Sequence, residues 1–448
     1  MKKIKTDVFI LGGGSAGIGC LYRLIKNGIS AVICDKNSGF GGTSVFSGVS
    51  CWEPGVSLYG IHEALAKELM KNGAYVAKSI PNNDFEKQPW ALSVKDENGK
   101  YSDTLKRCNM FFSDRQKEMR RFQFDGEDFN SALNTILKDY RKNFTAFFET
   151  SLKDVKTENG RIISCVLSNG TEIEAKYFVD CGGTAVPLIR MCGCKTAFGG
   201  QNDKFGEPSA IKQSGGINGV TYVFRLKKTQ DKNHIDDPDT PIDYSLLNPI
   251  PVSCFNTYPN GDINVNMLPT MQGDEYFRLG KDADEYGHRL VHNYVNFLAR
   301  EKGLTGYTLS KIFKAGVREG YTLRGKHVLT ENDIRKGVFS QENQSHFIAV
   351  GDHMLDVHGA GGLARELDIP YGIPVECCMT NEYENLFAAG TGASFSHIAS
   401  STVRLSRTMM SLGEGLGEYL SQKVLYKTVD FSKIQESQKF HETTEKWR

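Results

Sequence analysis

Residues 6–17 read TDVFILGGGSAG, an apolar run that ends in glycines with the spacing G-x-G-x-x-G. A helical pattern follows, and a second apolar run, AVIC at 31–34, ends at Asp35. Strand, glycine turn, helix and acidic residue in this order are the fingerprint of a dinucleotide site in a Rossmann-like α/β fold. The sequence therefore predicts a dinucleotide-binding domain that starts at residue 6.

Each residue type in this fingerprint has a physical task. Gly12 permits the sharp turn, Gly14 leaves room for a pyrophosphate, and Gly17 lets the helix pack closely on the strand. The N–H groups of the first helical turn attract phosphate, and Asp35 can accept a hydrogen bond from a ribose hydroxyl. A glycine-rich loop without a ligand is the alternative. The residues expected to contact the cofactor here are Gly12, Gly14, Ser15, Ala16, Gly17, Asp35 and Lys36.

A second glycine-rich stretch, GFGGTS at 39–44, lies shortly after Asp35. Backbone without side chains could run past a long cofactor toward its second half, although an ordinary turn has the same composition. We expect Gly41, Gly42, Thr43 and Ser44 to line the cofactor.

The pattern between residues 129 and 183 bears on which dinucleotide binds. A helical repeat at 129–140 leads into a β run near 146–148, and Asn-Gly pairs at 159–160 and 169–170 predict two hairpins. The apolar run 177–181 then ends at Gly182. A three-stranded meander inserted into a Rossmann-like sheet resembles the FAD domain of the glutathione-reductase type, which implies FAD rather than NAD.

The C-terminal third contains further motifs: REGYTLRG at 318–325, PYGIP at 370–374, ENLFAAG at 384–390, SFSH at 394–397 and STVR at 401–404. Together with the glycine fingerprint they look like the FAD-dependent oxidoreductase family that is related to the flavoprotein subunits of fumarate reductases. The resemblance implies that Gly390, Thr402 and Val403 approach the flavin. It also implies non-covalent FAD, since no His falls in the 41–51 loop where relatives that attach flavin carry one.

The expected fold class is α/β, with a Rossmann-like FAD-binding domain containing a β-meander and a mixed α+β substrate or cap domain. We assign residues 1–200 and 345–425 to the discontinuous FAD domain, with 53–118 as an insertion that could cover the flavin. Residues 205–340 form the substrate domain. Residues 426–448 form a polar tail, expected to be a loosely attached helix.

Composition excludes several other classes of protein. The net charge of +1 over 448 residues gives no global field for nucleic acid or anionic lipid. The first apolar run is too short for a signal sequence or a membrane span. The 11 scattered cysteines lack metal-site spacing, so we expect reduced thiols, no metal and a cytoplasmic location. A small-molecule substrate is the expected partner, and an electron-transfer partner or a homo-oligomer is compatible with the sequence.

Arg404 is the first candidate for charge stabilisation at the flavin. Ser400, Ser401 and Thr402 are helix N-cap residues, and an amphipathic pattern follows at 405–420. Arg404 would then stand in the first turn, where a cation opposes the helix dipole, so we expect it to serve an anion. A surface arginine paired with a carboxylate is the alternative.

Two histidines and two further arginines complete the candidate catalytic set. His397 could take a proton as hydride leaves carbon, or it could have a capping or packing role. The alternation in HMLDVH at 353–358 would put Asp356 and His358 on one face of a strand, although GAGG then replaces the family's acidic residues. Arg318 and Arg324 could bind a substrate carboxylate or hydroxyls, oriented by Glu319, or form surface salt bridges.

The sequence thus predicts hydride transfer between FAD and a small polar substrate, such as a sugar, hydroxy acid or unsaturated acid. A flavin monooxygenase and a flavin-binding electron-carrier subunit are the alternatives. A second G-x-G-x-x-G and a redox C-x-x-C are both absent from the sequence, which argues against disulfide reductases and more weakly against monooxygenases.

Overall fold

The computed structural model describes residues 2–445 except 53–54, 58, 79, 82–119, 201–204, 211–215, 249, 259, 360–361 and 366. Most of the 53–118 insertion therefore lies outside the described residues. Its described part contains α3 (Ile61–Lys71) and β5 (Ile80–Pro81).

The larger sheet has the strand order β7-β2-β1-β10-β9-β8, and β21 also pairs with β10. The pairs β7–β2, β2–β1, β1–β10 and β10–β21 are parallel, whereas β8, β9 and the first part of β10 form an antiparallel meander. This arrangement confirms the Rossmann-like sheet with an inserted meander. Its strands are β1 (Lys3–Leu11), β2 (Ala31–Cys34), β7 (Phe144–Phe147), β8 (Leu152–Glu158), β9 (Arg161–Leu167), β10 (Glu172–Asp180) and β21 (Leu386–Ala388).

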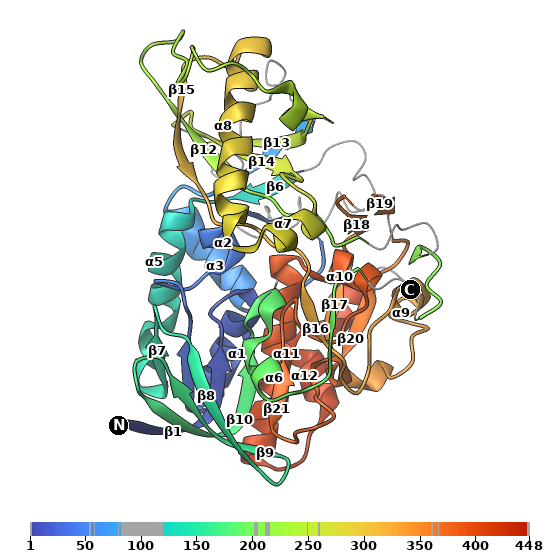
Figure 1. Ribbon diagram of the computed structural model, residues 1–448. Coiled ribbons are helices and arrows are strands. Elements are labelled where there is room, and N and C mark those ends of the chain that lie inside the picture. Colours follow the sequence, from blue (N-terminus) through green and yellow to red (C-terminus); the bar gives the residue numbers. More distant parts are fainter. Residues whose placement is uncertain are drawn as a thin grey trace.

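Two long helices, α1 (Ser15–Lys26) and α11 (Ser406–Leu425), pack against each other beside this sheet (Figure 1). Glycines make the approach this close. A Cβ on Gly413 would lie 2.0 Å from the carbonyl oxygen of Ala16, and one on Gly19 would lie 2.2 Å from that of Met410. Side chains at these positions would therefore push the helices apart. This explains why glycine occurs here, although glycine lowers the stability of a helix interior.

A second, five-stranded sheet has the order β15-β12-β14-β13-β5 and lies at the top of Figure 1. Its other strands are β12 (Val223–Lys228), β13 (Val252–Thr257), β14 (Ile263–Leu268) and β15 (Tyr307–Ile312), and α8 (Ala283–Glu301) covers one face. Strands and helices thus occur together in the 205–340 region, as expected for a mixed α+β domain. β5 adds a strand from the insertion to this sheet.

Further helices and strands of the described residues lie outside these two sheets and their long helices. They are α2 (Thr43–Phe46), β3 (Cys51–Trp52), β4 (Tyr75–Lys78), β6 (Arg120–Gln123), α5 (Gly126–Leu137), α6 (Pro187–Met191), β11 (Thr196–Phe198), α7 (Gly273–Leu279), β16 (Tyr321–Leu323), α9 (Glu331–Lys336), β17 (Phe347–Gly351), β18 (Leu355–Val357), β19 (Leu363–Arg365), β20 (Tyr371–Pro374) and α10 (His397–Val403).

The C-terminal tail differs from the expected loose helix. It forms α12 (Phe431–Ser437) and α13 (Phe440–Thr444). Ile434 is fully buried, the Phe431 ring stacks on His346 with centroids 4.5 Å apart, and Ser411 Oγ donates to Gln438 Oε1 over 2.9 Å. The expectation was wrong because two apolar side chains in a polar segment suffice to anchor it on α11 and β17.

Ten cysteines fall within the described residues, and all ten are free thiols. The same part of the chain holds no cluster of three or more metal-binding side chains. It also holds no helix that is long and apolar enough to cross a membrane.

Candidate cofactor and substrate site

The glycines of the first turn are required for two different reasons. Gly12 has φ of +110°, and a Cβ there would lie 2.2 Å from the carbonyl oxygen of Cys181. A Cβ on Gly17 would lie 1.9 Å from the carbonyl oxygen of Gly12. At Gly14, however, the nearest protein atom to a Cβ is 3.8 Å away. Protein packing thus explains Gly12 and Gly17, while the open space at Gly14 fits a pyrophosphate.

The second glycine-rich loop lies directly on the first. The Gly41 N–H donates to the carbonyl oxygen of Gly13 over 2.9 Å, and a Cβ on Gly42, whose φ is +50°, would lie 2.9 Å from Gly14 Cα. Thr43 and Ser44 then begin α2. The two loops predicted to bind the cofactor therefore form one cradle.

Asp35 organises this cradle. Its buried carboxylate accepts hydrogen bonds from the backbone N–H of Gly13 over 2.6 Å and of Asn37 over 2.7 Å. The carboxylate thus fixes the position of the first glycine turn. The ribose contact of Asp35, and any cofactor contact of the exposed Lys36, stay predictions.

Two later segments of the chain reach the same cradle. Gly390 has φ of +91°, and a Cβ there would lie 3.4 Å from the Ala16 side chain in the first turn of α1. Gly182 follows β10, and its N–H donates to Asp180 over 2.8 Å. Burial raises the pKa of Asp180 to about 6, although three backbone N–H groups oppose the shift. Gly182 and Gly390 therefore both lie beside the first glycine turn.

The helix expected to start near Thr402 is in fact two helices. Ser396 caps α10 by accepting from the Ala399 N–H over 3.0 Å, and Thr402 is fully buried in the last turn, where its hydroxyl lies 2.9 Å from that of Tyr371. Leu405 is extended and interrupts the helix before α11 begins. The predicted N-cap residues Ser400, Ser401 and Thr402 instead lie inside α10, because serine and threonine, although common at helix N-termini, also occur within helices.

This break changes the predicted role of Arg404. Arg404 is the C-cap residue of α10, where a cation is favourable, and Val403 beside it is fully buried. It is α11 whose N-terminus contacts the second glycine loop, since Ser406 Oγ lies 3.2 Å from Ser44 Oγ. The N-terminus of α11, rather than a helix start at Thr402, therefore lies beside this loop.

Arg404 and His358 share one carboxylate. Nη2 of Arg404 lies 2.6 Å from Oδ2 of Asp356, and Nε2 of His358 lies 2.8 Å from the same oxygen. The expectation that Asp356 and His358 share a face is confirmed, as is the carboxylate partner considered for Arg404. His353 Nε2 approaches Asp356 Oδ2 to 3.6 Å.

The protonation states in this cluster follow from its charges. Burial raises the pKa of Asp356. Hydrogen bonds from His353 and His358 and the charge of Arg404 lower it by more, so the pKa of Asp356 lies well below its usual range. Burial and the positive charges of Arg318 and Arg404 lower the pKa of His358, and their combined effect is larger than that of the Asp356 carboxylate, which raises it. The imidazole is therefore neutral at pH 7. Because Nε2 faces Asp356, Nδ1 is the nitrogen available as a proton acceptor.

Arg318 joins the cluster through residues 218–221. Its Nη1 donates to the carbonyl oxygen of Gly219 over 2.7 Å and to Thr221 Oγ1 over 2.8 Å. Asn218 Oδ1 accepts from the backbone N–H of His358 over 2.9 Å. Burial and the nearby charge of Arg404 lower the pKa of Arg318 to about 9, so it remains a cation at neutral pH.

His397 lies in a neighbouring, more enclosed group. Its Nδ1 is 2.7 Å from Oε1 of Glu319, and both side chains are at most 2% exposed. Glu319 Oε2 accepts from the Asn218 N–H over 2.9 Å, which connects this pair to His358. Nε2 of His397 is buried and has no hydrogen-bond partner among the described residues. This burial favours the packing alternative for His397. Glu319 thus orients His397, whereas the sequence predicted that it orients Arg318 and Arg324.

Arg324 is held by Phe395 and Thr322. Its Nη1 donates to the carbonyl oxygen of Phe395 over 3.0 Å and to Thr322 Oγ1 over 3.1 Å. Burial lowers its pKa, opposed by the charges of Glu207 and Glu319. Arg318, Asp356, His358 and Arg404 therefore lie together, and we call these four residues the substrate cluster after the role that the sequence predicts for them. No pattern in the sequence marks Asn218, whose role depends on contacts with residues more than 100 positions away.

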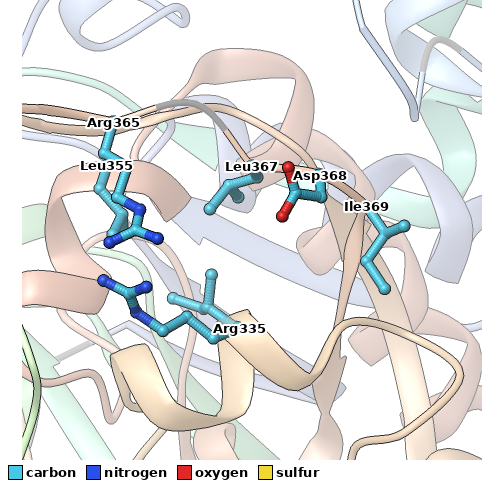
Figure 2. A pocket seen from close by; sticks show the side chains of 7 residues that line it. Arg335, Leu355, Arg365, Leu367, Asp368 and Ile369 are labelled. Atoms are coloured by element: carbon cyan, nitrogen blue, oxygen red, sulfur yellow. The ribbon is translucent and has the colours of Figure 1, made fainter.

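A pocket of about 110 Å³ is a separate feature (Figure 2). Leu355 of β18 lines it, whereas the adjacent Asp356 faces the substrate cluster. In Figure 2 the Arg335 and Arg365 side chains point toward each other across the pocket. Its other lining residues are Ile334, Leu367, Asp368 and Ile369. None of its lining residues belongs to the cofactor cradle or to the substrate cluster.

Comparison with known proteins agrees with this geometry. A family described as "FAD dependent oxidoreductase" matches residues 7–438. Two curated relatives match over 54 residues, or 12% of this chain: 4-oxocyclohex-2-ene-1-carboxylate 5-dehydrogenase of Sinomonas cyclohexanicum at 35% identity and 3-oxosteroid 1-dehydrogenase of Rhodococcus opacus at 33%. These matches span 9% and 11% of the relatives' own lengths.

The fold also has counterparts among solved structures. A flavoprotein/dehydrogenase from Cytophaga hutchinsonii aligns with a TM-score of 0.50 at 14% identity, covering 96% of this chain and 81% of that one. The identity is too low to transfer an activity, but the alignment supports a flavoprotein fold along the chain. The family match identifies FAD as the cofactor of this protein.

Proposed function

The chain belongs to the FAD-dependent oxidoreductase family, and from this premise we propose that it transfers hydride between FAD and a small anionic substrate held by Arg318, Asp356, His358 and Arg404. The observation that carries the proposal is the shared carboxylate of Asp356, which lies 2.8 Å from His358 Nε2 and 2.6 Å from Arg404 Nη2. It places a neutral proton acceptor beside a cation.

The charge balance of this cluster favours an anionic substrate group. Arg318 and Arg404 carry two positive charges and Asp356 carries one negative charge, which leaves one net positive charge. Only Nη1 of Arg318 has a protein acceptor among the described residues, so its second amino group remains available. A carboxylate held by a guanidinium gains a charge-assisted, directional hydrogen bond.

Bound FAD supplies the redox chemistry, since its N5 accepts or donates hydride. The residues of the chain manage the proton. In oxidation of an alcohol, His358 accepts the hydroxyl proton at Nδ1 while Asp356 holds the imidazole through Nε2 and stabilises the imidazolium that forms. Arg318 and Arg404 fix the substrate so that its reacting carbon stays in one place. In the reverse direction His358 returns the proton.

Anaerobic reduction of the bound flavin tests this proposal. Hydroxy acids, sugar acids and saturated acids are mixed with the purified holoenzyme, and loss of the oxidised flavin absorbance is recorded. We expect at least one class to bleach the flavin, and His358→Gln to slow bleaching about 100-fold or more.

Other outcomes would contradict hydride transfer with the substrate. Bleaching by NADH or NADPH alone, followed by oxygen-dependent substrate modification, would indicate a monooxygenase. Retained FAD with no reduction by any of these acids would indicate an electron carrier. Equal rates for wild type and His358→Gln would remove His358 from the mechanism.

A further inference from the structure

The two faces of the five-stranded sheet differ in chemistry. Phe224, Val265 and Phe255, one each from β12, β14 and β13, form an apolar core with α8. Because side chains alternate along a strand, their neighbours point to the opposite, inner face. The inner-face residues of these strands include Val223, Arg225, Cys254, Asn256, Asn264 and Asn266. Three of the six are asparagines, which is unusual for a buried sheet face.

The inner face lies against the loop that follows the second glycine stretch. A Cβ on Gly48 would lie 2.9 Å from Val223 Cγ1, and Asn264 Nδ2 donates to Ser50 Oγ over 3.1 Å. Since residues 41–44 line the cofactor cradle, this sheet face borders the far end of the cradle. Side chains here are placed to meet a substrate.

Asn264 has a structural role on this face. Besides Ser50, its amide donates to Tyr258 Oη over 3.0 Å and accepts from Arg225 Nε over 2.8 Å. Arg225 in turn pairs with Asp125 over 2.8 Å. The amide is thus hydrogen-bonded within the protein at both its oxygen and its nitrogen, and it ties the sheet to α5 and to the cofactor loop.

Asn266, two residues along the same strand and on the same face, has no comparable role. Its cross-strand neighbours are Val223 and Cys254. Its Oδ1 is buried and has no hydrogen-bond partner among the described residues. An unpaired buried amide oxygen lowers stability, and an apolar residue would be better there. A purely structural role therefore does not explain Asn266.

The position of Asn266 relative to the substrate cluster suggests a reason. Val223, its partner on β12, is two residues after Thr221, and Thr221 Oγ1 accepts from Arg318 Nη1 over 2.8 Å. Two residues of extended chain span about 7 Å. Asn266 therefore lies on β14, the strand next to β12, and about two residues along the strand direction from Thr221, which binds the Arg318 cation. Its side chain is on the face that borders the cradle.

Building on the function proposed above, we propose that Asn266 is a substrate-binding residue and that the substrate carries a neutral hydroxyl group besides its anionic group. The amide is uncharged, and its oxygen is a hydrogen-bond acceptor. A substrate hydroxyl donates to the buried oxygen, whereas an analogue that lacks the hydroxyl leaves this oxygen unpaired. Such a site discriminates strongly between the two.

The first test is the melting temperature of the FAD-loaded protein, with Asn264→Leu as the matched variant on the same strand and face. Asn266→Leu removes an unpaired amide, so we expect an unchanged Tm or a rise of about 1–3 °C. Asn264→Leu removes paired groups, so its Tm should fall by about 5 °C or more. A comparable fall for both variants would assign Asn266 a structural role and overturn the proposal.

The second test measures discrimination through changes in the flavin absorbance. Three pairs of acids that differ by one hydroxyl group are titrated into the holoenzyme: lactate and propionate, malate and succinate, 3-hydroxybutyrate and butyrate. Wild type should bind the hydroxylated member of at least one pair about tenfold tighter, and Asn266→Leu should bind both members equally. No preference in wild type, or the same preference in the variant, would overturn the proposal.

These outcomes are independent of the redox proposal. If Asn266 is needed to discriminate between the acids but no acid reduces the flavin, only the hydride-transfer proposal is contradicted. Flavin reduction with discrimination that survives Asn266→Leu would contradict only the role of Asn266.

Discussion

Oγ of Ser44 lies 3.2 Å from Oγ of Ser406, although 362 positions separate the two residues in the chain. This contact joins the second glycine-rich loop to the first turn of α11. A helix N-terminus carries a partial positive charge, which stabilises negative charge placed near it. We therefore expect α11 to stabilise the anionic reduced form of the bound flavin.

Ser406→Asp tests the role of the α11 N-terminus. A carboxylate there offsets the partial positive charge, an effect of about 0.5–2 kcal/mol. For a two-electron couple, in which 30 mV corresponds to about 1.4 kcal/mol, the flavin potential should fall by about 10–40 mV. Spectroelectrochemical titration of wild type and variant measures this shift. An unchanged potential with FAD still bound would show that the α11 dipole does not reach the flavin.

Arg404→Met is expected to weaken substrate binding rather than to shift the potential, because Arg404 pairs with Asp356 outside the first turn of α11. Loss of a charge-assisted hydrogen bond of about 1.5–3 kcal/mol predicts about 10- to 100-fold weaker binding of small carboxylates. Titration of the flavin absorbance with acetate or propionate measures the affinity. Arg404→Lys, which keeps the positive charge, should lose less affinity for small carboxylates than Arg404→Met. A large fall in potential with unchanged affinity would place Arg404 at the flavin instead.

Gly14→Val should abolish FAD binding while the protein still folds. A Cβ at Gly14 meets no protein atom closer than 3.8 Å, so the added side chain occupies only cofactor space. Gly17→Val is the matched control, since a Cβ there would lie 1.9 Å from a backbone oxygen and should disrupt folding itself. Flavin content and circular dichroism of the two variants separate these effects. Full flavin occupancy in Gly14→Val would contradict the assignment of the cradle.

The rate of flavin reduction by substrate should be independent of pH near neutrality and fall in acid. Burial and the charges of two arginines lower the pKa of His358 below its usual value of about 6.5. The base form is therefore complete at pH 7 and is lost only as the pH falls through the lowered pKa. Stopped-flow rates between pH 5 and 8 test this expectation. A rate that already falls between pH 8 and 7 would point to another base.

The same shift affects stability. Between the lowered pKa of folded His358 and its higher value in the unfolded chain, the unfolded state binds more protons, so stability rises with pH. In His358→Gln this part of the pH dependence should disappear. Urea denaturation between pH 5 and 7 measures the difference. Identical slopes for wild type and variant would show that His358 titrates normally in the folded protein.

The sequence alone was sufficient to predict the fold of the cofactor domain. The strand, the glycine turn and Asp35 lie within 30 residues, and the Asn-Gly hairpins each specify a local turn. Local backbone geometry decides such features: Gly12 and Asn159 adopt positive φ where the turns require it. Neighbouring residues carry the necessary information, so the Rossmann-like sheet and its inserted meander could be predicted from these patterns.

The division into α10 and α11, the enclosure of His397 by Glu319 and the role of Asn218 were decided only by the tertiary structure. Helical periodicity runs on across Leu405, and nothing near His397 in the sequence marks a residue 78 positions earlier as its partner. Whether a polar side chain faces substrate or the protein interior depends on which distant segments pack around it. Burial and hydrogen bonding are properties of that packing, whereas spacing along the chain determines only which residues can share a helix face, a strand face or a turn.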